Sequence, residues 1–398
     1  MKIQNTVSQV MKIWLRMFGI WPNMSCVLFC RLFWIVALIV EQILQYRYVV
    51  NHFHLIEFSE IMSILGAIVA YTVFLIKLII FWVKQRTFNK ILMMMAIDWE
   101  KCSSTKFSMF TMTCNAKRSQ RFVNMTAIFY AIAVTLFSSN VLVKHVDDGK
   151  PSNVSTRMFI LQMDLPFDVN RRFVYESVII VQFLHLILCS EAIGLLNALL
   201  INLILHVGGQ IDILCQNLME MFPKKGKSGP NNFMIKEIIE KHQKIITFSR
   251  YIEDLYSYIA LVLFISDTLI ICFLGFTIVT SIGRSDGMES IMKNLAFYLN
   301  MNMEAFIFCF SGEYLSAKSK SIGDAAYDSL WYKSDSRDSR TVQFLIMRSQ
   351  NQLTITIGKI MNLSLDRFSS VSSFFTRDIF FSTDFILKIA LLIISRNQ

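Results

Sequence analysis

The chain is poor in charge and in proline, and it lacks several common catalytic signatures. Asp, Glu, Lys and Arg make up 17% of its 398 residues, whereas 54% are hydrophobic and 34 are Phe. The few Pro residues all fall between the long apolar runs, and no HExxH, P-loop or GxGxxG pattern occurs. Soluble domains are about 45–50% apolar. The composition therefore disfavours a soluble domain and gives no support to an enzyme or a cofactor-dependent protein.

Cysteine and metal-ligand patterns are equally sparse. The eight Cys are dispersed, no CxxC occurs, and none lies in a loop expected outside a membrane, which argues against a disulfide framework. His52 and His54 could hold a metal ion, but with no Cys nearby they are better interpreted as part of a polar interfacial loop. The net charge of +10 could suggest nucleic acid as a partner. The basic residues, however, lie in short loops between apolar runs, which is typical of a membrane protein.

Hydropathy predicts an all-α membrane protein with seven transmembrane helices. The mean hydropathy is +0.48, and most of the apolar runs approach or exceed the roughly 20 residues that cross the hydrocarbon core. The expected spans are 32–50, 61–83, 122–143, 173–205, 258–282, 295–310 and a short, interrupted 379–394. An amphipathic segment over 10–21, stopped by Pro22, is expected to lie at the membrane interface.

The distribution of Lys and Arg predicts how these spans are oriented. Basic residues crowd the N-terminal segment and the loops within 84–121, 224–250 and 318–340, whereas the intervening loops carry few. Because Lys and Arg favour the cytosolic side, the N-terminus is expected in the cytosol and the C-terminus outside. This topology is the inverse of a G-protein-coupled receptor, and no Pro kinks a span as such a receptor would predict. A transporter would favour symmetric halves with broken helices, and none is evident.

The stretch 312–365 differs from the spans before it because it is polar and mixed in charge. Its second half has a helical period and contains Gly358 as its only glycine, so one helix is expected over 339–362. The apolar face of that helix comprises Val342, Leu345, Ile346, Leu353, Ile357 and Ile360. The pattern leaves two placements open: packing against other helices or subunits outside the lipid, or lying among the lipid headgroups.

The segments SGEYLSAKSKSIGDAAYDSLWY, RSQNQLTITIGK and NLSL in this stretch closely resemble the C-terminal signature of insect odorant receptors. The resemblance implies a single seven-helix domain over 1–398, a subunit of a ligand-gated cation channel. Its parts would be a cytosolic N-terminal segment (1–31), spans one to six (32–311), a long cytosolic anchor helix region (312–365) and a divergent seventh span (366–398). A gustatory receptor of the same superfamily is the nearest alternative.

The resemblance also implies partners and a location. The ligand would be a small volatile odorant, and the subunit would form a heterotetramer with the odorant receptor co-receptor in the plasma membrane of a sensory dendrite. The implied role of the anchor is packing between subunits, with packing inside one subunit as the alternative. The anchor residues that match the family signature are Tyr327, Leu330, Trp331, Tyr332, Gln350, Leu353, Thr354, Thr356, Gly358 and Lys359.

A pocket for an apolar ligand needs aromatic and aliphatic walls with few polar groups. The outer halves of spans two, three, four and six supply such walls. The candidates chosen by depth are Ile68, Tyr71, Phe137, Asn140, Phe183, Leu184, Phe297, Tyr298, Met301 and Asn302. Ordinary helix packing is the competing interpretation, because any membrane bundle is lined in this way.

Several ionisable residues fall inside the expected spans, where charge is costly and tends to face the bundle interior or a water path. They are Glu41, Glu176, Glu191, Asp267 and Glu304, with Lys77 as the basic counterpart. Each is expected to be either functional or part of a structural pair.

The tail after Ser370 departs from the weakly polar pore helix that the family resemblance implies. Four charged residues fall where that helix should cross: Arg377, Asp378, Asp384 and Lys388. Each costs about 2.5–3.5 kcal/mol at mid-bilayer on insertion scales. Two origins stay open for this tail, a seventh span that works despite its charges or translated intron sequence.

The loop charges generate a test of topology through the sequon at Asn153, beside Pro151 in a loop expected outside. Glycosidase treatment of the expressed protein should increase its gel mobility, and Asn153→Gln should abolish that shift. If Asn362→Gln abolished it instead, the predicted orientation would be wrong, because Asn362 is expected in the cytosol.

Overall fold

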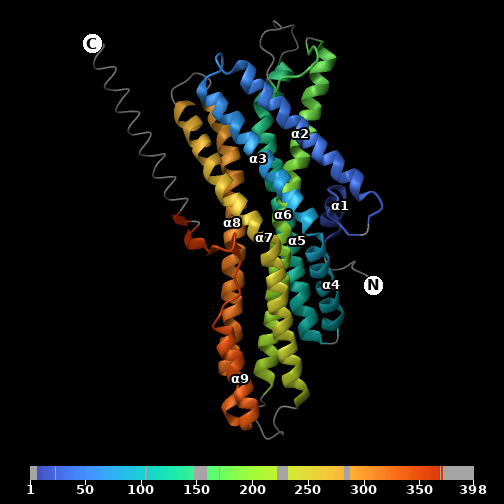
Figure 1. The fold of residues 1–398 in the computed structure, drawn as a ribbon, viewed down its shortest axis with the longest axis vertical. Coiled ribbons are helices and arrows are strands. Elements are labelled where there is room, and N and C mark those ends of the chain that lie inside the picture. Colours follow the sequence, from blue (N-terminus) through green and yellow to red (C-terminus); the bar gives the residue numbers. More distant parts are fainter. Residues whose placement is uncertain are drawn as a thin grey trace, which may run out of the picture.

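The computed structural model describes residues 7–22, 24–103, 105–147, 159–169, 171–221, 232–281, 287–367 and 369–370. They form an elongated bundle in which α6, α7 and α8 run along most of its length (Figure 1). The elements are α1 (Gln9–Met17), α2 (Val27–His52), α3 (Phe58–Val83), α4 (Gln85–Cys102), α5 (Lys106–Asp147), α6 (Arg172–Glu220), α7 (Asn232–Ser281), α8 (Gly287–Asp328), the 3-10 turn η3 (Trp331–Lys333), α9 (Ser336–Ser349) and the strands β1 (Thr356–Ile357) and β2 (Met361–Asn362).

The helices confirm the all-α membrane architecture. Among the described residues, five helices are long and apolar enough to cross a membrane: α2, α3, α5, α6 and α7. They contain the first five expected spans. The sixth expected span lies in α8, which continues past it into a polar half. The expected span 379–394 lies outside the described residues.

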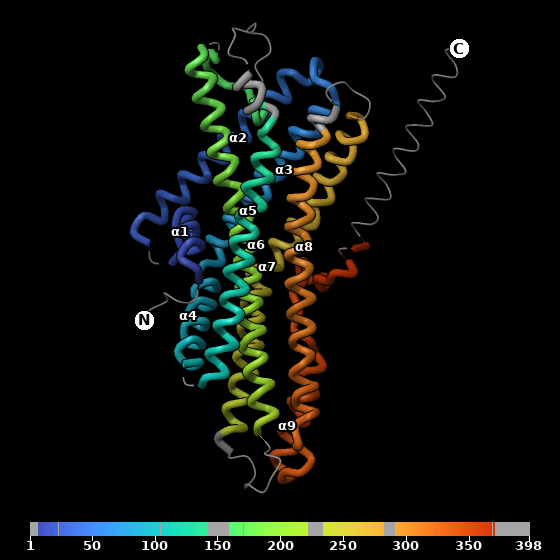
Figure 2. Tube along the Cα trace, turned by 180° about the vertical axis from the view of Figure 1, so that it is seen from behind, coloured from blue at the N-terminus to red at the C-terminus, as the bar shows by residue number. Residues whose placement is uncertain are grey.

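Helix α6 forms the centre of the bundle. Nearly every side chain from Leu195 to Leu214 is buried, as expected of a helix that is apolar all round. Helices α5, α7 and α8 pack along it, and α5 lies beside α6 in both views (Figure 2). A side chain at Gly194 would place its Cβ 2.9 Å from the Tyr130 ring. Glycine at this position therefore allows α5 and α6 to approach closely.

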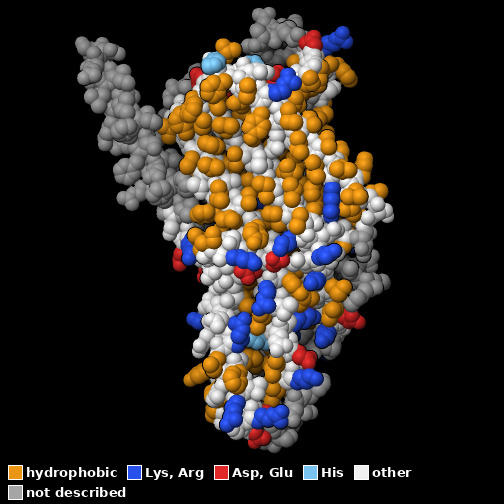
Figure 3. Space-filling model, viewed as in Figure 1, with side chains coloured by type: hydrophobic (Ala, Val, Ile, Leu, Met, Phe, Trp, Pro, Cys, Tyr) orange, Lys and Arg blue, Asp and Glu red, His pale blue; other side chains and the backbone are white. Residues whose placement is uncertain are grey.

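The surface divides along the length of the bundle. Hydrophobic side chains cover one part almost continuously, whereas Lys and Arg gather over the part that contains α4 and α9 (Figure 3). Many exposed apolar side chains belong to α2, α5 and α6. An apolar belt of this kind suits a bilayer, and the polar part suits water.

A buried polar network secures α4 to the bundle at this basic end. The Asp98 carboxylate lies 3.2 Å from His206 Nε2 and 2.5 Å from Lys244 Nζ. Burial alone would raise the pKa of Asp98, but the hydrogen bonds and charges of these two partners outweigh it and hold that pKa below its ordinary value. Asp98 thereby joins α4 to α6 and α7.

The prediction of one helix over 339–362 is wrong. Helix α9 ends at Ser349, and an extended segment follows that forms the short antiparallel pair β1–β2. Gly358 and Lys359 make the turn with φ of 57° and 63°, a conformation that stops a helix. The apolar residues Leu353 and Ile357 pack on the main core although the segment that carries them is not helical.

This hairpin is fastened to α7 by hydrogen bonds. The backbone N–H of Gly358 donates to the Ser257 carbonyl over 3.0 Å, and that of Lys359 donates to Ser257 Oγ over 3.1 Å. Thr356 Oγ1 donates to Glu253 over 2.9 Å. A Cβ at Gly358 would lie 2.8 Å from Leu261. The TITIGK part of the signature is thus a turn that seats the segment after α9 against α7.

An ion pair is buried in the apolar part of the bundle. Lys77 of α3 donates to Glu304 of α8, and their side chains are only 2% and 3% exposed. Asp267 of α7 adds a second carboxylate within electrostatic reach of Lys77. Two of the acids singled out in the spans therefore surround the one base, and the group connects three helices.

Removing one member of this pair should strongly destabilise the protein. Lys77→Met leaves a buried carboxylate without its partner and should lower the free energy of unfolding by about 3–5 kcal/mol. Adding Glu304→Leu should restore much of the loss. Thermal unfolding of the purified protein measures both changes.

The exposed pair Arg172–Glu176 is a matched control, with Nε and Oε1 2.7 Å apart and 76% of the Arg172 side chain exposed. Arg172→Met should change stability by less than about 1 kcal/mol, because water screens that pair. A double variant as unstable as the summed single losses would contradict the role of the Lys77–Glu304 pair.

Candidate functional site

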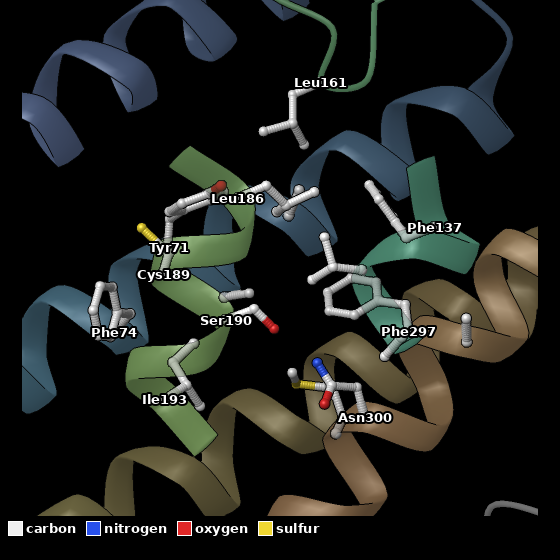
Figure 4. Close-up of a pocket in the computed structure, with 16 residues that line it drawn as sticks. Tyr71, Phe74, Phe137, Leu161, Leu186, Cys189, Ser190, Ile193, Phe297 and Asn300 are labelled. Carbon is white, nitrogen blue, oxygen red and sulfur yellow. The ribbon is translucent and has the colours of Figure 1, made fainter. Parts of the chain in front are cut away.

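A cavity of about 80 Å³ lies inside the apolar part of the bundle. Side chains of α3, α5, α6 and α8 surround it, and Leu161 of the segment 159–169 covers one end (Figure 4). Its lining residues are Ala67, Ala70, Tyr71, Phe74, Ala133, Val134, Phe137, Leu161, Leu186, Cys189, Ser190, Ile193, Ala296, Phe297, Asn300 and Met301. Typical sites for drug-sized ligands span about 300–1,000 Å³, so this cavity suits a much smaller molecule.

Alanine and aromatic residues together create this space. Ala67 and Ala70 on α3 and Ala296 on α8 leave room where larger side chains would meet. The rings of Phe137 and Phe297 close one wall, packed edge to face with centroids 6.1 Å apart. The result is an apolar chamber with a rigid aromatic side.

Two polar atoms face this chamber without a partner. Among the described residues, none of Ser190 Oγ, Asn300 Oδ1 and Tyr71 Oη has a hydrogen-bonding partner, although all three atoms are buried. The Tyr71 hydroxyl lies near the Glu41 carboxylate, so Ser190 and Asn300 are the two that face the chamber. Figure 4 shows the Ser190 hydroxyl and the Asn300 amide pointing into the space between α6 and α8. Unpaired buried polar atoms cost about 1–3 kcal/mol each, and a ligand that hydrogen-bonds them would recover that cost.

The chemistry available here is non-covalent binding. The lining contains one thiol, of Cys189, and two hydroxyls, of Ser190 and Tyr71, but no carboxylate, imidazole or ammonium group that could activate them. Within the described residues, no group of three or more His, Cys, Asp and Glu could hold a metal ion. A small apolar molecule with one or two hydrogen-bonding groups is the ligand that fits.

The structure brings four of the ten candidate ligand residues to this cavity: Tyr71, Phe137, Phe297 and Met301. Five others lie elsewhere. Ile68 is buried away from the cavity, Leu184 is 52% exposed, Phe183 and Tyr298 pack on hydrophobic clusters, and Asn302 lines a separate groove between α7 and α8. The Asn140 side chain lies outside the described residues. Ligand contact by any of the ten stays a prediction.

Sequence reasoning missed the two polar atoms and the alanines. Asn300 stands one helical turn after Phe297, so the face that carries Phe297 could have indicated it. Nothing in the sequence distinguishes Ser190 from other serines in apolar helices. Alanine leaves no periodic signal either, because it suits core and surface alike.

The ten anchor residues fall into an exposed group and a docked group. Tyr327 and Tyr332 are 67% and 62% exposed, and Gln350 and Lys359 are also exposed. Leu330, Trp331 and Leu353 pack against the main core. Thr356 and Gly358 contact α7, and Thr354 is half-buried. Packing between subunits stays a prediction for all ten, and the Asn153 glycan site lies outside the described residues.

Comparisons with known proteins agree on one family. Residues 57–375 match the model of the family described as "7tm Odorant receptor". Odorant receptor 67c of Drosophila melanogaster is 24% identical over 277 residues, which cover 69% of this chain and 64% of that protein. The odorant receptor coreceptor of Anopheles gambiae is 26% identical over 165 residues, covering 38% of this chain and 34% of that protein. The chain thus spans less than two thirds of these relatives.

A solved structure shares the fold over nearly the whole length. The insect olfactory receptor OR5 from Machilis hrabei, in complex with eugenol, superposes with a TM-score of 0.76. The match covers 96% of this chain and 97% of that one at 13% sequence identity. At this identity the match establishes the fold alone.

The unpaired Ser190 hydroxyl predicts an unusual response to mutation. Ser190→Ala should not lower the free energy of unfolding and should raise it by up to about 1–3 kcal/mol, because it removes a buried hydroxyl that has no partner among the described residues. Ser257→Ala, the control, should cost about 1–3 kcal/mol since Lys359 N–H loses its acceptor. Thermal unfolding compares them, and an equal loss at both positions would mean that the Ser190 hydroxyl has a partner inside the fold.

Proposed function

The chain belongs to the seven-transmembrane odorant receptor family, and on that premise we propose what it binds and how it works. It binds a small volatile organic molecule in the cavity between α3, α5, α6 and α8, and it gates a non-selective cation pore together with the odorant receptor co-receptor. The gustatory and G-protein-coupled alternatives lose support, because the family match is to odorant receptors.

The single observation that carries this proposal is the apolar cavity with two unpaired polar atoms. Volatile molecules are small and mostly apolar, with at most a few hydrogen-bonding groups. Such a ligand would bury its apolar surface against Phe137 and Phe297 and would pair with Ser190 or Asn300. Burial supplies about 25 cal/mol per Å² of apolar surface, and the hydrogen bond supplies orientation.

Helix α8 offers a route from ligand binding to gating. Its residues 296–301 line the cavity, and the same unbroken helix continues to Asp328, beside η3 and α9. A ligand that favours one position of α8 would therefore also bias the contacts at its far end. Binding would act by shifting the population between closed and open arrangements.

The far end of α8 and the α9 region carry an exposed apolar surface that we assign to subunit assembly. We define this assembly surface by Tyr327, Tyr332, Phe344 and Met347, which are between 62% and 68% exposed. Large apolar side chains gathered on a polar part of a molecule are typical of an interface. The co-receptor is the partner that the family implies, in the plasma membrane of a sensory neuron dendrite.

Neighbouring aromatic residues of α8 should respond differently to mutation. Phe297 and Tyr298 both pack against the cluster of Ile270, Leu274 and Met301, but of the two only Phe297 lines the cavity. Phe297→Ala removes about 1.5–3 kcal/mol of apolar contact and should raise the half-maximal odorant concentration about tenfold or more.

Currents in cells that co-express the co-receptor measure this effect, after an odorant panel has identified an agonist. Tyr298→Ala, as the control, should shift potency by less than about threefold. Equal shifts for both variants would place the odorant elsewhere in the bundle, and a panel without any agonist would argue against the proposed function itself.

The assembly surface generates a second test with a closely matched control. Phe344 is 68% exposed at the assembly surface, and Phe110, at the start of α5, is 69% exposed. Phe344→Ala combined with Tyr332→Ala should reduce co-purification with the co-receptor by about tenfold. Phe110→Ala should leave it unchanged, and unchanged recovery of the Phe344 and Tyr332 variant would remove this surface from the interface.

A further inference from the structure

A second cavity lies on the side of the bundle, between α2 and α6. Its volume is about 560 Å³, and the segment 159–169 closes one end. Apolar side chains form its walls, and several are well exposed, such as Val40 at 48% and Val181 at 64%. The cavity is therefore a groove that opens sideways within the apolar belt.

The floor of this groove is polar. Glu41 of α2 is only 8% exposed, and its Oε2 lies 2.6 Å from Nδ1 of His185 on α6. Both side chains line the groove, among walls supplied by valines, leucines and phenylalanines. Gln182 also reaches the groove, but its amide is already used by the backbone of Ile160 and Leu161. Ser177 adds a hydroxyl that already donates to the Phe173 carbonyl. Glu41 and His185 are thus the ionisable groups among the lining residues that can meet an occupant.

A carboxylate in such surroundings favours a cationic partner. A carboxylate has two oxygens with about four positions that accept hydrogen bonds and none that donates. Oε2 of Glu41 is turned to His185, and the Tyr71 hydroxyl lies near the same carboxylate, so Glu41 can still accept from an occupant of the groove. An ammonium group donates three hydrogen bonds and carries the complementary charge. The long apolar walls offer contact for an alkyl chain. We propose that this lateral groove binds an aliphatic primary amine, with its ammonium group on Glu41 and its alkyl chain along Val40, Val178 and Val181.

The groove is separate from the central cavity but shares one layer of side chains with it. The His185 ring stacks on Tyr71 with centroids 5.8 Å apart, and its Nε2 lies 3.6 Å from Cys189 Sγ. Tyr71 and Cys189 face the central cavity, whereas His185 faces the groove. An amine bound to Glu41 would therefore contact His185, which packs on two residues that line the central cavity, without entering that cavity. The site itself does not depend on the function proposed above.

Photolabelling tests the site in the purified full-length protein in phosphatidylcholine nanodiscs. The probes are octylamine and octan-1-ol, each with a diazirine on its chain, and labelled peptides are read by mass spectrometry. The amine should label residues 37–44 and 173–185. Val181→Trp fills the groove and should reduce that labelling by about tenfold. Ile180→Trp is the control, because Ile180 is 58% exposed but does not line the groove.

The charge is tested by Glu41→Gln, which keeps the shape of the side chain. Labelling by the amine should fall by about tenfold, whereas labelling by the alcohol should change by less than about twofold. If this variant does not purify as a folded protein, competition on the native chain decides: unlabelled octylamine should displace the amine probe and equimolar octan-1-ol should not.

Three results would overturn the proposal. Equal labelling of the native groove by amine and alcohol would show that the groove binds alkyl chains without preferring an ammonium group. Unchanged labelling in Val181→Trp would place the amine elsewhere. Labelling confined to residues 293–301 would put the amine in the central cavity. Since none of these readouts needs a current or a co-receptor, they are independent of whether the chain responds to odorants.

Discussion

The buried pair of Lys77 and Glu304 fixes how the apolar half of the bundle fits together. A charge in this setting is tolerated only when its partner lies beside it, so a slip of α3 against α8 by one turn would separate the two groups at great cost. Phe74 stands one turn before Lys77, and Met301 stands one turn before Glu304. The pair therefore fixes the axial position of α3 relative to α8, and both helices line the central cavity.

The central helix α6 adds a second constraint. Its buried half leaves no lipid-facing side, so α5, α7 and α8 must all pack against it. The first half of α6 is different, because Ser190 lines the central cavity and His185 lines the lateral groove. Helix α6 thus holds the bundle together in the polar half of the molecule. In the apolar half of the molecule it separates two candidate binding sites.

The hairpin after α9 explains why the C-terminal signature has its particular residues. Gly358 is needed because the turn has a positive φ and because any Cβ would collide with Leu261 on α7. Thr356 is needed because its hydroxyl donates a hydrogen bond to the Glu253 carboxylate. These residues make contacts inside the subunit, whereas Tyr327 and Tyr332 remain exposed.

The sequence alone determined the membrane class and the first five helical spans, because the cost of burying polar backbone in lipid forces long apolar helices that hydropathy detects. The residues of the C-terminal signature indicated the family. The sequence did not determine that the apolar residues after Ser349 lie on an extended segment. These residues are three to four positions apart, as on a helix, but the structure shows that Leu353 and Ile357 pack one by one against the bundle. Only the tertiary structure decided which of the many apolar side chains line the central cavity. Four of the candidates chosen by depth line it, together with Ser190 and Asn300. Which side of a helix faces the cavity depends on how that helix packs against its neighbours. The pairing of Glu41 with His185 and of Lys77 with Glu304 is likewise a property of packing, which brings together residues that are far apart in the chain.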